Sequence, residues 1–234
     1  LSLFGLLSVL FLLHYFKGKD NLTFLFIGSF LLGFTFSIKW NGLGFWLMSF
    51  LFVLFILFLT KYLKKEQKKA LLSHEQRFKT NFLSILFLPF VGYLIFWIPD
   101  LFFNGSDIVD RHLQMASYHT DNIEQKSHPY SSSWFTWPIM LRPIAYYFSS
   151  QEVINASGGS LTVFNAVHLF PNPALTLLSS VAIFILSLNW VSSLSKVISS
   201  KAYDSDFVAS AFILLGYYSN FLPWAVVSRS AFIY

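Results

Sequence analysis

The sequence predicts an all-α integral membrane protein with a polytopic helix bundle, and three observations support this fold class. Hydrophobic residues make up 55% of the 234 residues and charged residues only 12%, whereas a globular chain carries roughly 25% charged residues. Phe occurs 29 times and aromatic residues reach 20%, which is more apolar surface than a soluble fold of this size can bury. The apolar residues are also grouped in long uncharged runs. This composition excludes disordered and coiled-coil classes.

Six uncharged stretches are predicted as membrane-spanning helices, because about 20 apolar residues are needed to cross the hydrocarbon core. The first is short, so we expect the chain to be an internal fragment whose first helix begins before residue 1. The fourth contains Pro89, which predicts a kink, and the sixth has Pro223 near its far end. The predicted spans are residues 1–16, 21–38, 41–60, 80–99, 171–195 and 207–228.

The charge of the connecting gaps predicts the orientation. Residues 61–79 carry seven basic residues against two acidic ones, so the positive-inside rule makes this loop cytoplasmic. The long gap over residues 100–170 then lies outside, and it holds three basic residues against six acidic ones. The net charge of +5 therefore reflects membrane orientation, and no nucleic acid partner is predicted. The chain divides into four spans over 1–99, an extracytoplasmic loop over 100–170, and two spans over 171–234.

The outer loop is not uniform along its length. Residues 107–126 are polar and are predicted as a loop or short helix. Residues 134–148 are apolar and aromatic, but two prolines and an arginine interrupt them, so they are too short to span. A short interfacial or re-entrant helix is predicted there, with its Trp and Tyr side chains at headgroup depth. The SGGS run at 157–160 is predicted as a flexible link.

Three cationic residues on the predicted outer side are candidate ligands for an anionic substrate. Lys39 and Trp40 follow the second span, where a lysine is either a snorkelling anchor or a phosphate ligand. Arg142 lies within an apolar segment and needs a carboxylate, carbonyls or a lipid phosphate as its partner. Arg229 follows the last span and is either a flanking charge or a further ligand.

Other kinds of chemistry find no support in the sequence. Cys is absent, which excludes disulfides, thiolate metal sites and a Cys nucleophile. The spacing of His112, His119 and His128 matches no standard ligand pattern, so no metal site is predicted. Phosphate-cradling glycine loops, catalytic serine motifs and zinc-protease signatures do not occur in the sequence.

The run HPYSSSWFTWPIMLRPIAYY, which begins at His128, closely resembles the outer-loop signature of protein O-mannosyltransferases. Three shorter segments agree with the family in order. SIKWNGL at 37–43 resembles its S-x-K-W-x-G-L, and NPA at 172–174 resembles its helix start after the loop. LPW at 222–224, followed by Arg229 and Phe232, resembles its L-P-W…R-x-x-F segment. The chain is therefore similar to the C-terminal part of this family.

This resemblance implies a GT-C membrane fold and a glycosyltransferase that moves mannose from a polyprenyl-phosphate carrier to Ser or Thr hydroxyls of exported proteins. The lipid-linked sugar is a substrate, so no separate cofactor is expected. The other implied partners are the exported polypeptide acceptor and membrane lipids. The residues implied in donor-phosphate or substrate binding are Lys39, Trp40, His128, Tyr130, Ser131, Arg142 and Arg229.

The resemblance also implies where the remaining parts of the enzyme lie. The family's catalytic acidic residue belongs to its first outer loop, so it is expected upstream of Leu1. The outer loop lacks a large soluble insertion, which favours a bacterial-type member with its active face outside the plasma membrane. Three alternatives stay open: a related transferase that moves another sugar to a lipid or glycan, a transporter, or a subunit without chemistry. A transporter would place charged residues within its spans.

Overall fold

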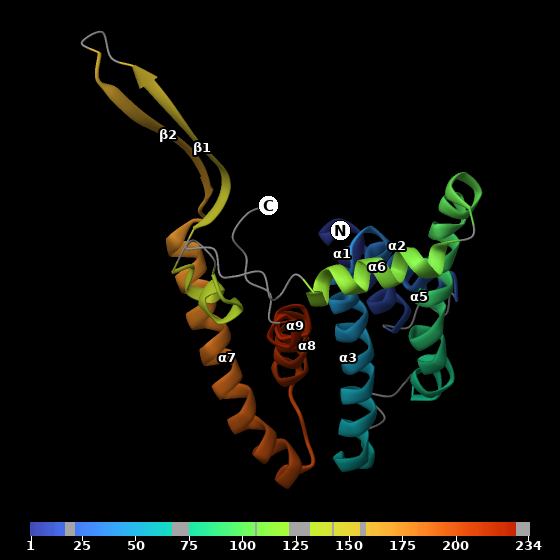
Figure 1. Cartoon of the computed structure of the whole chain (residues 1–234). Helices are drawn as coiled ribbons and strands as arrows, with labels where there is room; N and C mark the ends of the chain where they lie inside the picture. The colour runs from blue at the N-terminus through green and yellow to red at the C-terminus, as the bar shows by residue number, and fades with distance from the viewer. Residues whose placement is uncertain are drawn as a thin grey trace. The chain divides into compact units, whose positions relative to one another are not determined.

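The computed structural model describes residues 1–16, 22–66, 75–105, 107–121, 132–141, 143–154 and 158–227 (Figure 1). The chain divides into two compact units. The first comprises Leu1–Arg111 and Leu186–Pro223, and the second comprises His112–Ile185 and Trp224–Tyr234.

The first unit is a bundle of apolar helices, as predicted. Among the described residues, three helical segments are long and apolar enough to cross a membrane: Trp40–Tyr62, Phe82–Asn104 and Pro173–Ser200. These findings confirm the polytopic helical fold. The elements of the unit are α1 (Ser2–Phe16), α2 (Leu22–Ile38), the 3₁₀ helix η1 (Trp40–Gly42), α3 (Leu43–Tyr62), α5 (Glu75–Asn104), the first turn of α6 (Ile108–Asp121), the second half of α7 (Pro173–Ser200) and α8 (Ser205–Phe221).

Helices α5 and α8 end at residues other than the predicted span boundaries. Charged residues cause the difference at α5, and proline causes it at α8. Helix α5 continues beyond both ends of the predicted span 80–99, because charged residues mark the membrane boundary without ending a helix. The predicted span 207–228 is divided, since α8 ends at Phe221 and Pro223 begins the short helix α9 (Pro223–Val227). Proline has no N–H to continue a preceding helix, but it is well suited to start one.

Helix α2 packs against α1 and α5 through glycines. Gly28 lies against Leu12 of α1, and Gly33 lies against the backbone of Pro89 and Tyr93 in α5. A Cβ atom on Gly33 would overlap the carbonyl oxygen of Pro89, so glycine is needed for this approach. The buried core that these helices share with α3 consists of Leu12, Tyr15, Leu25, Leu32, Val53, Ile56 and Ile85.

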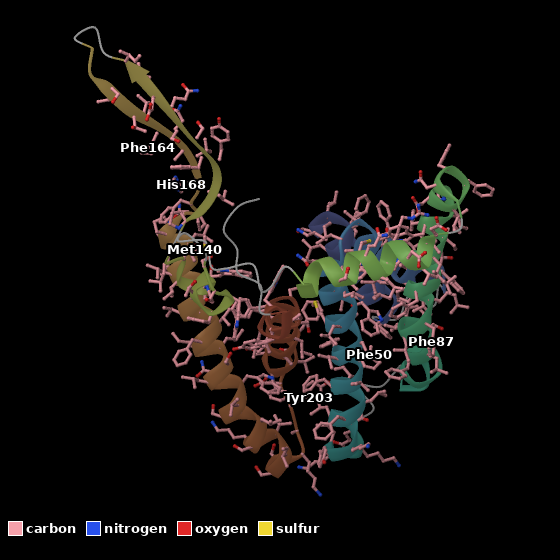
Figure 2. The ribbon with its side chains drawn as sticks, viewed as in Figure 1. Phe50, Phe87, Met140, Phe164, His168 and Tyr203 are labelled. Atoms are coloured by element: carbon pink, nitrogen blue, oxygen red, sulfur yellow. The ribbon has the colours of Figure 1, made fainter. Side chains whose placement is uncertain are left out.

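Helix α3 runs antiparallel to α8, beside which it lies in Figure 1. Gly44 at its start faces Asn220 near the end of α8, whereas Phe55 near its own end contacts Phe207 at the start of α8. Helix α3 also runs antiparallel to α5, and Phe50 of α3 contacts Phe82 of α5 with 5.1 Å between their ring centroids. Figure 2 shows Phe50 on α3 and Phe87 on α5.

The connection between α7 and α8 packs beside the end of α3, at an end of the unit that carries several lysines and is called the basic end here. The Trp190 ring stacks on Phe207 at 5.3 Å, and its indole nitrogen donates a 3.2 Å hydrogen bond to the Phe207 carbonyl. The backbone N–H of Lys64 donates to the carbonyl of Lys201 at 3.0 Å, which joins two loops. Burial raises the pKa of Tyr203, which lies in this connection (Figure 2). Because α3 and α8 run antiparallel, the lysines that follow α3 and those around the α7–α8 connection lie at the same end of the unit.

The second unit contains a β-hairpin that the sequence did not predict. Strands β1 (Ile144–Ile154) and β2 (Ser160–Leu169) pair antiparallel, with a register irregularity between Ala145 and Tyr147. The predicted interfacial helix over 134–148 is therefore wrong beyond its first half, where only the 3₁₀ helix η3 (Trp134–Ile139) forms. Met140 ends η3 at φ 43, and Pro143 precedes the strand because its fixed φ suits extended backbone.

The structure describes parts of two further segments of the loop, the polar stretch over 107–126 and the SGGS run at 157–160. The polar stretch over 107–126 forms α6 up to Asp121, which confirms the predicted short helix there. Within the predicted flexible link, the described residues Gly158 and Gly159 lead into β2, and Gly158 adopts φ +79. This left-handed conformation favours glycine, so the glycines serve the reversal of a hairpin.

Candidate functional site

Lys39 lies in a tight turn at the end of the first unit opposite the basic end. Its backbone is extended, and its carbonyl accepts a 2.8 Å hydrogen bond from the Gly42 N–H. A Cβ atom on Gly42 would lie 2.6 Å from the backbone of Thr35, so the turn needs glycine to fold back on α2. The Lys39 side chain is exposed. This turn therefore presents a cation at the end of the bundle.

Trp40 fastens this turn to α5. Its indole nitrogen donates a 3.2 Å hydrogen bond to the Tyr93 hydroxyl. Tyr93 in turn stacks on Phe36 of α2, with 5.0 Å between ring centroids, and contacts Trp97 at 6.0 Å. Aromatic packing on two helices thus fixes the residue that follows Lys39. Of the predicted site residues, Lys39 and Trp40 are the two that the structure describes.

The outer-loop signature can be followed from Ser132 onwards. Ser132 is buried, and its hydroxyl and carbonyl oxygens accept hydrogen bonds of 3.1 and 3.3 Å from the Trp137 indole. The Thr136 hydroxyl donates to the Ser133 carbonyl at 2.7 Å. These bonds fold the signature into a compact turn. Five predicted site residues lie outside the described residues: His128, Tyr130, Ser131, Arg142 and Arg229.

The second unit also brings together separate parts of the family resemblance. Trp137 of the signature contacts Trp224 of the LPW segment in an edge-to-face arrangement, with 5.2 Å between centroids. The Ser180 hydroxyl of α7 donates to the carbonyl of Pro138. Asn172 caps α7, since its Oδ1 accepts from the N–H groups of Ala174 and Leu175 at 3.0 and 3.2 Å. The predicted helix start at NPA is therefore confirmed.

The first unit contains an ion pair that sequence reasoning missed. Asp100 lies two helical turns beyond Tyr93 on α5, and its carboxylate is 2.9 Å from the guanidinium of Arg111 in α6. Asp100 directly follows the predicted span 80–99, and Arg111 lies early in the polar stretch 107–126. Nothing in their spacing along the sequence indicates that the two side chains form an ion pair. Within the described ranges, no group of three His, Asp or Glu side chains gathers as a metal site would require.

The chain shares sequence with known membrane transferases. Residues 105–234, more than half of the chain, match a family described as the C-terminal four TMM region of protein-O-mannosyltransferase. Two curated relatives, from Mycolicibacterium smegmatis strains ATCC 700084 / mc(2)155 and MKD8, are both polyprenol-phosphate-mannose–protein mannosyltransferases. Each is 28% identical over 114 residues, which cover 48% of this chain but only 19% of the relative. No solved structure matches the chain.

Proposed function

Because the chain belongs to the protein O-mannosyltransferase family, we propose that it forms part of a membrane enzyme that moves mannose from a polyprenyl-phosphate carrier to Ser or Thr hydroxyls of exported polypeptides. The observation that carries this proposal is the family match over 105–234, which includes the entire outer-loop signature. The names of the two bacterial relatives add the donor and the class of acceptor.

The proposed reaction creates negative charge on a phosphate. The acceptor oxygen forms a bond to the anomeric carbon while the bond from that carbon to the carrier phosphate breaks. The electron pair of the broken bond stays on the phosphate, and the hydroxyl proton passes to a general base. Family resemblance assigns the base to an acidic residue of an earlier outer loop. The task left to this chain is to stabilise the departing phosphate, which fixed cations do best in a site that excludes water.

Lys39, Arg142 and Arg229 are the cations to which we assign this task. One observation supports the assignment of Lys39: the Trp40–Tyr93 hydrogen bond fastens its turn to α5 at the end remote from the basic loops. By the positive-inside rule, that remote end is extracytoplasmic. We assign the shaping of the donor or acceptor pocket to His128, Tyr130 and Ser131. The bacterial relatives favour the plasma membrane as its location.

A transfer assay with the full-length protein tests this function. Membranes containing it should move labelled mannose from synthetic polyprenyl-phosphate mannose to a Ser/Thr-rich peptide, and should not use GDP-mannose directly. Lys39→Ala should lower kcat about 100-fold, as removal of a charge-stabilising donor does, and Lys39→Arg should retain more activity. Lys201→Ala removes an exposed lysine from the opposite end and should have no effect. Transfer of a different sugar, or uptake of solute without transfer, would replace the proposal with one of its alternatives.

A further inference from the structure

Lysines from two separate segments of the first unit lie together at its basic end. One group lies at and just after the end of α3, and the other lies at the end of α7 and at the start of its connection to α8. All of them are exposed, and they are Lys61, Lys64, Lys65, Lys196 and Lys201. We propose that this set, called the basic patch, binds the phosphate headgroup of an anionic phospholipid. The patch lies at the end opposite the Lys39 turn, so this binding is separate from the proposed transfer reaction.

A backbone hydrogen bond and a buried cluster hold the two segments together. The N–H of Lys64 donates to the Lys201 carbonyl at 3.0 Å, so the backbones of these two lysines are direct neighbours. The buried apolar cluster that joins the same segments consists of Leu59, Leu63, Val197 and Phe207. Leu63 directly precedes Lys64, and Val197 directly follows Lys196. Packed structure therefore fixes the backbone that carries the lysines.

Lys201 has a backbone conformation that lysine disfavours. It directly follows the last residue of α7 and has φ 54, in the left-handed region where helices commonly end in glycine. A Cβ atom makes this region costly. The packing needs the conformation, because the Lys201 carbonyl is the acceptor for the Lys64 N–H. Glycine would satisfy the same geometry with less strain, so a lysine at this position points to a use for its charge.

The charge of the patch is available to a ligand. Among the described residues, no ion pair joins one of these lysines to a carboxylate. The acidic residues nearest to Lys201 in sequence serve the start of α8 instead. Asp204 caps this helix by accepting a 2.7 Å hydrogen bond from the Phe207 N–H, and Asp206 lies in its first turn, where a negative charge is favourable. The described part of this end has five lysines against three acidic residues and stays positive.

The position of the patch favours a lipid headgroup as its partner. It lies where α3 and α7 end, and both helices are long and apolar enough to cross a membrane. Lysines directly after such helices lie at headgroup depth, and their long side chains can reach a phosphate. By the positive-inside rule this end is cytoplasmic, and lysine clusters at that surface attract anionic lipids of the inner leaflet.

Thermal unfolding of the full-length protein in neutral detergent micelles tests the patch. At low salt, added phosphatidylglycerol should raise Tm by at least about 3 °C, because a ligand that binds the folded state stabilises it. Phosphatidylcholine, which has no net charge, and inorganic phosphate at the same concentration should have no such effect. Sodium chloride at about 0.5 M should reduce the rise, since salt screens exposed charges.

Variants at Lys201 separate its charge from its backbone role. Lys201→Gly relieves the left-handed strain, so it should raise Tm in micelles without phosphatidylglycerol and yet reduce the rise that this lipid causes. Lys201→Arg keeps both the charge and a Cβ atom, so it is the matched control and should keep the full rise. The double variant Lys64→Gln/Lys201→Gln should lose at least about half of the rise.

A full rise in the double variant would overturn the basic patch as the binding site, and so would the absence of any rise in wild type. An equal rise with phosphatidylcholine would show that headgroup charge is irrelevant, and an equal rise with inorganic phosphate would make the ligand a free anion. Either result overturns the proposal. If the double variant does not accumulate, Lys201→Gly against Lys201→Arg carries the same comparison.

Discussion

The indole nitrogen of Trp46 donates a 3.2 Å hydrogen bond to the backbone carbonyl of Ile85. That carbonyl would normally accept from the residue four positions later in α5, but this residue is Pro89, which has no N–H. Within a membrane, a backbone carbonyl without a partner is costly, because lipid offers no donor. Helix α3 thus supplies the hydrogen bond that proline removes from α5, and this bond fixes the register of the two helices.

We expect Trp46→Phe to lower the free energy of unfolding by about 1–3 kcal/mol, because it leaves the Ile85 carbonyl unsatisfied. In a Pro89→Ala background, the backbone N–H gained by the substitution can donate to that carbonyl, so Trp46→Phe should cost about 1 kcal/mol less there. Unfolding of the purified protein in mixed micelles, followed by circular dichroism, measures both. Strict additivity of the two substitutions would show that the hydrogen bond contributes nothing.

Two glycines should respond differently to replacement by alanine. At Gly33, a methyl group meets the Pro89 carbonyl and the α5 backbone, so Gly33→Ala should destabilise the protein by about 1–3 kcal/mol. At Gly216, the nearest atoms are 3.3 Å away on the flexible side chain of Met48. Gly216→Ala should be neutral or stabilise by up to about 1 kcal/mol through helix propensity. Thermal unfolding of both variants in detergent provides the comparison, and equal shifts in Tm would contradict it.

Arg142 should be needed for turnover. In the full-length protein, Arg142→Ala should lower transition-state stabilisation by about 2–4 kcal/mol, because a cation at the departing phosphate is lost. Arg142→Lys keeps the charge without the bidentate fork and should fall between Ala and wild type. Transfer rate has to be measured beside membrane abundance. Normal turnover in Arg142→Ala would make Arg142 an interfacial anchor, and a parallel loss of abundance would make it a structural charge.

The orientation can be checked with single cysteines in this Cys-free chain. Ser150 on β1 and Ser199 near the end of α7 are both exposed. In intact cells, Ser150→Cys should react with a membrane-impermeant thiol reagent, whereas Ser199→Cys should react only after the membrane is opened. The prediction follows from the basic residues of the inner loops. The reverse pattern would place Lys39 on the cytoplasmic side and remove it from the proposed site.

The helices could be predicted from sequence, whereas their pairing could not. Backbone in lipid must satisfy its own hydrogen bonds, so a long apolar stretch such as Leu43–Tyr62 has to be helical. In such a helix nearly every face is apolar, and hydropathy does not indicate which side meets a neighbour. The contacts of Trp46 with Ile85, and of Asp100 with Arg111, depend on that missing information.

The sequence contains a local signal for the β1–β2 hairpin that its aromatic composition obscures. The aromatic run from Trp134 to Phe148 suggested one interfacial segment, and its composition hid the change at Pro143 from helix to strand. Gly158 and Gly159 between two runs rich in strand-forming residues are a hairpin pattern. A prediction that treats residues 134–148 as one helix leaves these glycines as a linker. At the site, the Lys39 turn could be predicted as a family motif, but its attachment through Tyr93 could not.

The pairing of α3 with α8 has a consequence for biosynthesis. About 140 residues separate the end of α3 from the start of α8, and at about 5–20 residues per second their synthesis takes roughly 7–30 s. Until then, the face of α3 that carries Gly44, Met48 and Phe52 has no α8 to pack against. Newly inserted α3 must therefore wait in the membrane with this face against lipid, the translocon or a chaperone. Failure to deliver α8 in time would expose a glycine-containing helix surface to foreign helices and to membrane quality control.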